Sequence, residues 1–326
     1  MTRVARDPDG PVIIATRSSE LALRQAREVA AALAARGIES ELETYRTVGD
    51  KRLDEPLSEI GAKGLFTAEL EHDLARGRVD CAVHSLKDLP TDSPAGLVVA
   101  AVLKREDPRD ALVFGPQVVS GTGLDALPRG SRVGTSSLRR RAQLLALRPD
   151  LDVAELRGNV GTRLKKVDGG QVHAAILAAA GLHRLDARQH VGAYLEPPEW
   201  LPAAGQGAIA IQIRSDDERM LAFARDVNDA DTWSAVRAER AFLAALDGGC
   251  QVPIGALARM HDGAMHLWGM IADVRGTRVI RGDLVVDATA PEESGQRLAG
   301  ELRGRGAGEI LAGLREVKKI PSPQPE

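Results

Sequence analysis

The chain has 326 residues, of which 43 are Lys or Arg and 46 are Asp or Glu, with a formal net charge of −3 and 44% hydrophobic residues. This length and apolar content allow two or three domains with their own cores and exclude a wholly disordered chain. No stretch reaches the ~18 apolar residues of a membrane helix, and we expect no secretory signal in the polar first ten residues. Two cysteines cannot form a disulfide framework, so we expect a cytoplasmic protein. Because the chain has no apolar span, we also expect that it does not bind a membrane.

The basic residues are unevenly placed along the chain. Arg outnumbers Lys by 35 to 8, a total for which a GC-rich coding bias is the simplest explanation. Between Arg129 and Lys166, however, ten basic residues accompany three acidic ones, which gives a local charge of +7. That segment contains no aromatic residue, whereas nucleic-acid binders usually combine a basic face with stacking aromatics. The pattern therefore favours a small polyanion as ligand and no nucleic acid.

The first third of the chain alternates strand and helix patterns. The expected elements are a strand at Val12–Thr16, a helix begun by Ser18 or Ser19 and ended by Gly37, a strand at Ile38–Thr47, a helix over Phe66–Leu74 closed by Gly77, and a strand at Val79–Val83. The sequence HSLKDLP then predicts a loop, because Pro90 prevents a helix. The charged segment Asp50–Lys63 predicts a mobile lid, with a plain solvated loop as the alternative.

The alternation begins again after the polar stretch Lys104–Pro108 and changes near Asp231. The expected strands lie at Ala111–Phe114, Arg132–Gly134, Val153–Leu156, Ala174–Leu177 and Ala208–Ile213, with helices ending at Leu147, beginning at Val160 and spanning Ala178–Leu185. Two such units predict two α/β lobes with a central cleft, where ligands lie beyond the carboxyl ends of the strands. Beyond Asp231, a helix, strands near Ile254–Met260, Ala264–Asp273 and Thr277–Val286, and C-terminal helices predict a smaller α+β domain.

Three strand-to-helix junctions carry groups that bind anions. Arg17-Ser18-Ser19 places a guanidinium and two hydroxyls at a helix N-terminus, and the segments 135–140 and 157–159 repeat the arrangement with Arg139, Arg140 and Arg157. Free backbone N–H groups and the helix dipole favour negative charge there, and guanidinium groups bind carboxylates in a bidentate manner. Because no P-loop pattern is present, the junctions predict a cleft lined for oxyanions rather than a nucleotide site.

Few other residues carry reactive groups in a suggestive context. Within HSLKDLP, Lys87 and Asp88 are either a solvated surface pair or, if Asp88 faces the arginines, a carboxylate that stabilises cations and moves protons. His84 is equally well explained as a structural histidine, and the seven histidines show no metal-ligand spacing, so we predict no metal. Cys250 lies in an expected tight turn and is a candidate for covalent chemistry, whereas Cys81 fits a buried strand.

Eight motifs that follow one another in a single order resemble the porphobilinogen deaminase (hydroxymethylbilane synthase) family over nearly the whole chain. The motifs are ATRSSELALRQA, EIGAKGLFTAELE, DCAVHSLKDLPT, VGTSSLRRRAQL, LRGNVGTRL, AAGLHRL, LPAAGQGAIAI and GGCQVPIGA. The resemblance implies two lobes like those of periplasmic binding proteins, formed by residues 1–107 with 207–227 and by residues 108–206. It also implies a C-terminal domain, residues 228–326, that carries the cysteine. The segment Asp50–Lys63 matches a mobile lid over the cleft.

The resemblance also implies the reaction. Members of the family hold a dipyrromethane cofactor covalently on the cysteine that matches Cys250, as a thioether, and add four porphobilinogen units head to tail with loss of ammonia. Water then releases hydroxymethylbilane. Each pyrrole carries an acetate and a propionate, which would explain the arginine-lined junctions. A monomer is implied, with a transient contact to the next enzyme of the pathway.

The residues that match the functional positions of the family are the following. Asp88 would be catalytic; Cys250, Lys87, Thr135, Ser137, Arg139, Arg140, Asn159 and Arg163 would bind the cofactor; Arg17, Ser19, Arg157 and Arg184 would bind substrate. Glu20 stands where many relatives have proline, but glutamate suits a helix start equally well. The rival interpretation is a two-lobed binding protein for a small carboxylate, which explains the lobes and arginines but leaves Cys250 without a role.

Overall fold

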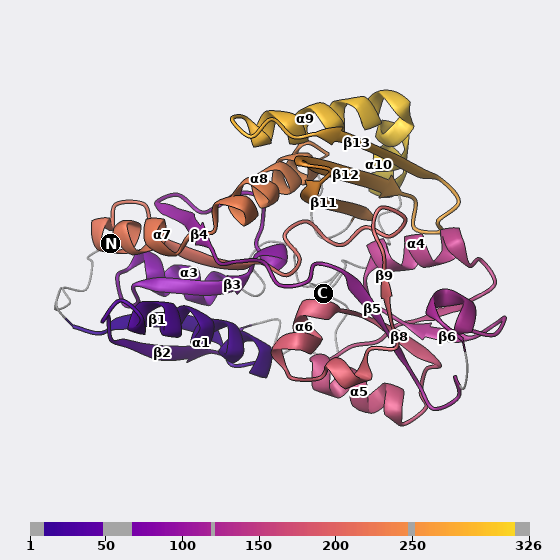
Figure 1. The fold of residues 1–326 in the computed structure, drawn as a ribbon, viewed down its shortest axis with the longest axis horizontal. Coiled ribbons are helices and arrows are strands. Elements are labelled where there is room, and N and C mark those ends of the chain that lie inside the picture. Colours follow the sequence, from indigo (N-terminus) through magenta and orange to yellow (C-terminus); the bar gives the residue numbers. More distant parts are fainter. Residues whose placement is uncertain (1–9, 48–66, 119–120, 247–251, 317–326) are drawn as a thin grey trace. The chain divides into compact units, whose positions relative to one another are not determined.

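A computed structural model describes residues 10–47, 67–118, 121–246 and 252–316 (Figure 1). These residues form two compact units. The first unit contains residues 10–47, 67–106 and 208–233, and the second contains the other described residues from Asp107 to Gly207 and from Ser234 onward. The chain therefore leaves the first unit near Glu106 and returns to it at Ala208.

The first unit is built on a five-stranded sheet in the order β2-β1-β3-β10-β4. Its strands are β1 (Val12–Arg17), β2 (Ser40–Tyr45), β3 (Cys81–Ser85), β4 (Leu97–Val102) and β10 (Ile209–Arg214). Strand β1 is parallel to β2 and β3, whereas β10 is antiparallel to both β3 and β4. The sheet therefore gains its fourth strand from a segment that follows the whole second lobe in the sequence.

Helices cover both faces of this sheet. Helices α1 (Glu20–Ala34) and α7 (Glu218–Val227) share one hydrophobic cluster with Ile14, Val83 and Ile211, and α3 (Ala68–Ala75) packs on the other face against Ala15 and Ala82. Successive strand residues thus face opposite layers, and both are buried because each face has its own helix. Apolar residues at helical spacing in α1, with the Ser19 hydroxyl accepting from the backbone N–H of Ala22 at 3.3 Å, explain why the helix begins there.

The second unit repeats the same plan with the order β7-β6-β8-β5-β9. Its strands are β5 (Asp110–Phe114), β6 (Arg132–Gly134), β7 (Asp152–Ala154), β8 (Ala174–Ala178) and β9 (Ala193–Leu195). Strand β6 is parallel to β7 and β8, and β5 is antiparallel to β8 and β9. Helices α5 (Val160–Asp168) and α6 (Ala179–Arg184) cover one face, and α4 (Leu138–Leu147) covers the other. In each sheet, one strand is antiparallel to both of its neighbours: β10 in the first sheet and β5 in the second.

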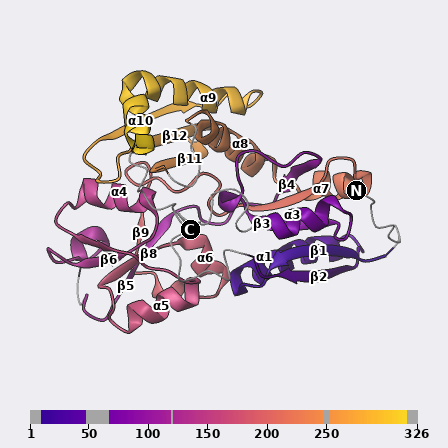
Figure 2. The same cartoon turned by 180° about the vertical axis from the view of Figure 1, so that it is seen from behind.

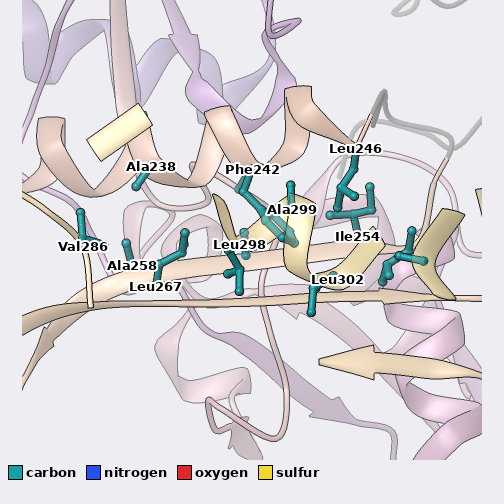
Figure 3. Close-up of a cluster of buried hydrophobic side chains, with 14 of the residues drawn as sticks. Ala238, Phe242, Leu246, Ile254, Ala258, Leu267, Val286, Leu298, Ala299 and Leu302 are labelled. Carbon is teal, nitrogen blue, oxygen red and sulfur yellow. The ribbon is translucent and has the colours of Figure 1, made fainter. Parts of the chain in front are cut away.

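A smaller three-stranded sheet completes the second unit. Strands β11 (Ile254–His261), β12 (Ala264–Ala272) and β13 (Val279–Val285) form an antiparallel meander, and α8 (Ala230–Ala245), α9 (Pro291–Leu302) and α10 (Gly308–Glu316) belong to the same part of the chain (Figures 1 and 2). Figure 3 shows the core between the helices and the sheet, where Phe242 of α8 and Leu298 of α9 meet Leu267 of β12. The two α/β lobes followed by a smaller α+β part confirm the predicted fold class.

Helix α4 is packed on two sides. Leu144 joins the core of the β5–β9 sheet, while Ala142 lies in a second cluster with Leu257 and Met270 of the small sheet. A helix that is fixed by two cores has little freedom to tilt or turn. The residues in its first turn are therefore held by a rigid element.

Gly276, in the turn between β12 and β13, shows how closely the small sheet approaches α4. Its φ is +70°, and a Cβ there would clash with the carbonyl oxygen of Ala142 and lie 2.6 Å from the backbone nitrogen of Ala146. We expect Gly276→Ala to lower the urea midpoint by considerably more than Gly263→Ala, whose glycine has φ +81° but open space around it. The control isolates the backbone strain, about 1 kcal/mol, and the clash adds about 1–3 kcal/mol. Equal midpoints for the two variants would contradict this close contact.

Among the described strands and α-helices, two strands and one helix were not expected from the sequence, and one further segment differs from its prediction. Strands β4 and β9 and helix α7 were not predicted. In HSLKDLP, the predicted loop is wrong for its first half: β3 continues to Ser85, and Leu86–Asp88 form a single 3-10 turn, η2. The turn ends at Leu89, just before Pro90, so proline limits the helix as expected but does not abolish the first turn.

Candidate active site

In the first unit, two parallel strands bring predicted site residues to one edge of the sheet. Strand β1 ends at Arg17 and is followed by Ser19, while β3 ends at Ser85 and is followed by Lys87 and Asp88 on η2. Because β1 and β3 are parallel neighbours, their carboxyl ends meet at the same edge. All four predicted residues of this unit are partly accessible there.

A chain of buried and half-buried polar groups lies beneath this edge. The imidazole Nε2 of His84 is 3.1 Å from Oε1 of Gln212, and Nε2 of Gln212 donates to Oε1 of Glu71 at 3.0 Å. Since the Gln212 amide nitrogen faces Glu71, its oxygen faces His84, and the imidazole carries its proton on Nε2. Next to it, Nε2 of Gln25 donates to the Ser85 hydroxyl at 2.8 Å. Side chains from α1, α3, β3 and β10 thus fix the end of β3, from which Lys87 and Asp88 follow.

His84 is neutral in this setting. Burial lowers its pKa from 6.5 to about 4, and the charge of Arg17 acts in the same direction, whereas the hydrogen bond with Gln212 opposes the shift. The unfolded chain therefore binds a proton at His84 between about pH 6.5 and pH 4 that the folded chain does not bind. Folding stability must fall as the pH falls through this window.

We expect His84→Gln to reduce this pH dependence. Between pH 7 and pH 5, the native protein should lose about 2 kcal/mol of unfolding free energy through His84, and the variant should lose that much less. Glutamine still offers an N–H to Gln212, so the comparison isolates the titration. Urea unfolding at the two pH values measures the difference. The same loss in both proteins would show that His84 is not the group responsible.

In the second unit, the ends of two further parallel strands carry predicted residues. Strand β6 leads into Thr135 and Ser137, both buried, and the Ser137 hydroxyl accepts from the backbone N–H of Arg140 at 3.4 Å as the cap of α4. Strand β7 leads to Arg157, and Oδ1 of Asn159 accepts from the backbone N–H of Thr162 at 2.8 Å as the cap of α5. The two loops adjoin, since the Ser136 hydroxyl donates to the carbonyl of Leu156 at 2.9 Å.

The other predicted arginines of this unit are anchored to backbone carbonyls or to an acid. Nε of Arg163 donates to the carbonyl of Gly158 at 2.8 Å, and Nη2 of Arg184, at the end of α6, donates to the carbonyl of Gly207 at 3.1 Å. Arg157 forms an ion pair with Glu155. All three arginines are half-buried, so part of each side chain remains accessible to solvent.

Arg139 and Arg140 are buried, with 4% and 1% of their surfaces exposed, and both contact Asp110 at the start of β5. Nη1 of Arg139 donates to Oδ2 of Asp110 and Nη2 of Arg140 donates to Oδ1, each at 2.8 Å. Burial alone would raise the pKa of Asp110, but the charges and hydrogen bonds of the two arginines outweigh it and hold that pKa far below its usual range. The carboxylate is therefore ionised, and the cluster is a charged one.

The structure thus brings the predicted residues into two groups. Arg17, Ser19, Lys87 and Asp88 share one sheet edge in the first unit; Thr135, Ser137, Arg139, Arg140, Arg157, Asn159, Arg163 and Arg184 belong to the second. Cys250 and the segment Asp50–Lys63 lie outside the described residues. Sequence analysis missed Asp110, together with Trp200 and Gln206, which also contact its carboxylate. The one available signal was an acid opening the apolar strand DALVF.

Two features that the described part of the chain lacks bear on other classes of protein. Among these residues, no group of three or more His, Cys, Asp or Glu side chains is arranged to hold a metal ion. None of the helices that the structure describes has both the length and the apolar character needed to span a membrane.

Comparison with known proteins places the chain in a family. A family model described as "Porphobilinogen deaminase, dipyromethane cofactor binding domain" matches residues 12–222, and one described as "Porphobilinogen deaminase, C-terminal domain" matches residues 233–304. The chain is 47% identical over 305 residues to a porphobilinogen deaminase from Syntrophobacter fumaroxidans, covering 93% of this chain and 97% of that protein. It is 50% identical over 307 residues to one from Moorella thermoacetica, covering 94% and 96%.

Solved structures show more distant likeness. The crystal structure of the methionine-binding protein MetQ matches with 14% identity and a TM-score of 0.43, covering 70% of this chain and 93% of that one. The family models and the curated relatives give stronger evidence. One family model spans both α/β lobes, a second spans most of the smaller part that follows, and the relatives are near half identical over almost the whole chain. Together they show that the chain belongs to the porphobilinogen deaminase family.

Proposed function

We propose that this chain joins four porphobilinogen molecules head to tail on a dipyrromethane cofactor held by Cys250, with Asp88 as the catalytic carboxylate. Membership of the family carries the transferase activity of tetrapyrrole biosynthesis and the dipyrromethane cofactor. The observation that carries the assignment to residues is the gathering of basic and hydroxyl side chains at the carboxyl edges of the two sheets. In α/β proteins this edge is where ligands bind.

The first turn of α4 fits a ligand that carries carboxylates. Arg139 and Arg140 lie in that turn, which contains no acidic residue, and Thr135 and Ser137 precede it. Two cations at a helix N-terminus are unfavourable against the helix dipole, whereas an anion at that end is favoured by both the dipole and the arginines. Asp110 supplies one carboxylate from a neighbouring strand. The donor set therefore suits the acetate and propionate groups of the cofactor, which Lys87, Asn159 and Arg163 would also help to hold.

The incoming substrate requires the same kind of partner. We assign the carboxylates of porphobilinogen to Arg17, Ser19, Arg157 and Arg184, which are half-buried and lie at strand or helix ends. Half-buried guanidinium groups can form bidentate pairs that are less screened than those on an open surface. Because the pairs are directional, they would fix the orientation of the pyrrole ring as well as its position.

Asp88 is the group assigned to proton transfer. It lies on η2, directly after the strand that the His84–Gln212–Glu71 chain and the Gln25–Ser85 pair hold in place. When bound, the cofactor supplies the pyrrole carbon to which the first substrate is joined. Asp88 would accept and return the protons that move as ammonia departs, and its negative charge would stabilise the cationic pyrrole of the substrate.

Two measurements test the proposed function. The purified protein should have an intact mass that exceeds the sequence mass by one dipyrromethane, and it should release four molecules of ammonia for each tetrapyrrole formed from porphobilinogen. A carboxylate-binding protein without this activity would bind porphobilinogen at unmodified mass and release no ammonia. That result would contradict both the covalent attachment and the reaction.

The remaining expectations concern the protein in the cell. We propose that the enzyme acts as a monomer in the cytoplasm, that residues 228–326 act as the domain that carries Cys250, and that the product passes to the next enzyme through a transient contact. The support is the family membership and the single small sheet with its own helical core that follows the second lobe. Size-exclusion chromatography with light scattering would detect any stable oligomer.

A further inference from the structure

The carboxylate of Asp110 is the centre of a cluster that the proposed mechanism does not explain. It is fully buried, and each of its oxygens accepts two hydrogen bonds. Oδ1 accepts from Nη2 of Arg140 at 2.8 Å and from Nε2 of Gln206 at 2.9 Å. Oδ2 accepts from Nη1 of Arg139 at 2.8 Å and from the indole Nε1 of Trp200 at 2.7 Å. Four donors satisfy the four lone-pair sites of a carboxylate, so its orientation is fixed.

Asp110 holds the two arginine side chains from strand β5, whereas the arginines themselves belong to helix α4. Asp110 opens β5, which is paired with β8, while Arg139 and Arg140 begin α4, which is packed between two cores. An arginine side chain carries about 2 kcal/mol of rotamer entropy. Two charge-assisted hydrogen bonds from a rigid strand remove much of that freedom before any ligand arrives. A carboxylate ligand would then bind without the full cost of ordering both guanidinium groups.

The same cluster contains residues that lie near the two points where the chain passes from one unit to the other. Asp110 follows shortly after the chain leaves the first unit, and Gln206 stands just before it returns at Ala208. Nε2 of Gln206 also donates to the carbonyl of Pro108 at 2.7 Å. The two connecting segments are therefore bonded to each other and to the arginines within the second unit. A purely structural clamp would account for this bonding, so the test has to separate a clamp from a role in ligand binding.

We propose that Asp110 is a positioning residue, which holds the guanidinium groups of Arg139 and Arg140 in the arrangement that receives the carboxylates of the dipyrromethane cofactor. The inference rests on the proposed function. Asp110 itself does not touch the ligand: an acid would repel its carboxylates, and its own oxygens are fully occupied by donors of the protein. Asp110 acts by fixing the orientation of the two planar guanidinium groups.

The decisive experiment follows the loading of the apoprotein by mass. Asp110→Asn keeps the volume of the side chain but replaces one acceptor oxygen by an amide that donates, so at least one of the four donors must turn away. Apoprotein prepared without cofactor is incubated with porphobilinogen, and the fraction with the added dipyrromethane mass is measured over time. We expect loading to be about ten- to a hundredfold slower, the effect of losing one or two charge-assisted hydrogen bonds to the ligand.

A matched variant controls for lost stability. Asp217→Asn removes the carboxylate that forms an ion pair with the buried Arg214 in the first unit, and asparagine can still cap α7. It should lower the melting temperature yet load at the native rate when both variants are studied well below their melting temperatures. Native-rate loading by Asp110→Asn would overturn the proposal. Wild-type protein that gains no mass would instead overturn the proposed function, and this inference with it.

Double variants test whether Asp110 acts through the arginines. Arg139→Lys and Arg140→Lys should each slow loading, because lysine keeps the positive charge but lacks the planar guanidinium group that binds a carboxylate with two hydrogen bonds. Adding Asp110→Asn to either should slow loading by much less than it does in the native background; independent, multiplying effects would contradict positioning. If Asp110→Asn does not fold, Asp110→Glu and Trp200→Phe displace the carboxylate or remove one donor more gently. Native-rate loading by both of these would also overturn the proposal.

Discussion

Asp88→Asn should keep the fold and the cofactor but lose about 10²–10⁴ of the turnover rate, the usual worth of general acid–base assistance. Asparagine has the shape of aspartate, but it neither takes up a proton nor neutralises a cation. A negative charge about 4 Å from a cationic pyrrole in a partly shielded site contributes ~4 kcal/mol, which corresponds to about 10³-fold in rate and lies in the middle of that range. The measurement is single-turnover release of ammonia from porphobilinogen.

The comparison must separate chemistry from loading. The intact mass of each preparation gives the fraction that carries cofactor, and rates are normalised to it. Asp92→Asn is the matched control, since Asp92 is an exposed acid four residues further along the same segment. It should turn over at the native rate. Near-native turnover by Asp88→Asn would remove Asp88 from its assigned role, and loss of activity in both variants would indicate that the segment is sensitive to any change of charge.

Cys250→Ser should abolish the covalent cofactor, so that the purified variant has the mass of its sequence alone. The reactive form of cysteine is the thiolate, and a serine hydroxyl is not ionised at neutral pH. Activity should fall with the mass excess, because the growing chain would have no attachment. Intact mass spectrometry of the variant and of the native protein measures the effect directly.

The second cysteine provides the control. Cys81 is buried in β3, and burial raises the pKa of its thiol above the ordinary value, so it stays protonated and inert. Cys81→Ser should retain the dipyrromethane mass while losing some stability, since it places a hydroxyl in an apolar core. An excess mass that persisted in Cys250→Ser and disappeared in Cys81→Ser would exchange the roles of the two residues.

Local patterns in the sequence were enough to predict most elements and the places of the candidate ligands. The expected strand at Arg132–Gly134 and the helix end at Leu147 agree with the structure, and Ser19, Ser137 and Asn159 cap helices. Such features depend on neighbours within a few residues: apolar spacing, a capping hydroxyl, a glycine at a helix end. Two of the missed elements, β9 and β4, lacked a clear local signal, whereas α7 carried one in its cap Asp217 and in the helical spacing of Met220 and Phe223. Strand β9 has three residues, and β4 is an unbroken apolar run that periodicity does not distinguish from a helix.

The sequence by itself therefore determined the family, the alternation of strands and helices, and the basic junctions that follow the strands. Only the tertiary structure decided that β10 lies between β3 and β4, and that one carboxylate from β5 accepts from the arginines of α4, from an indole and from an amide. Asp110 is 29 residues from Arg139, 90 from Trp200 and 96 from Gln206. Contacts at such separations arise from the burial of whole sheets and helices against one another, and no spacing rule along the chain encodes them.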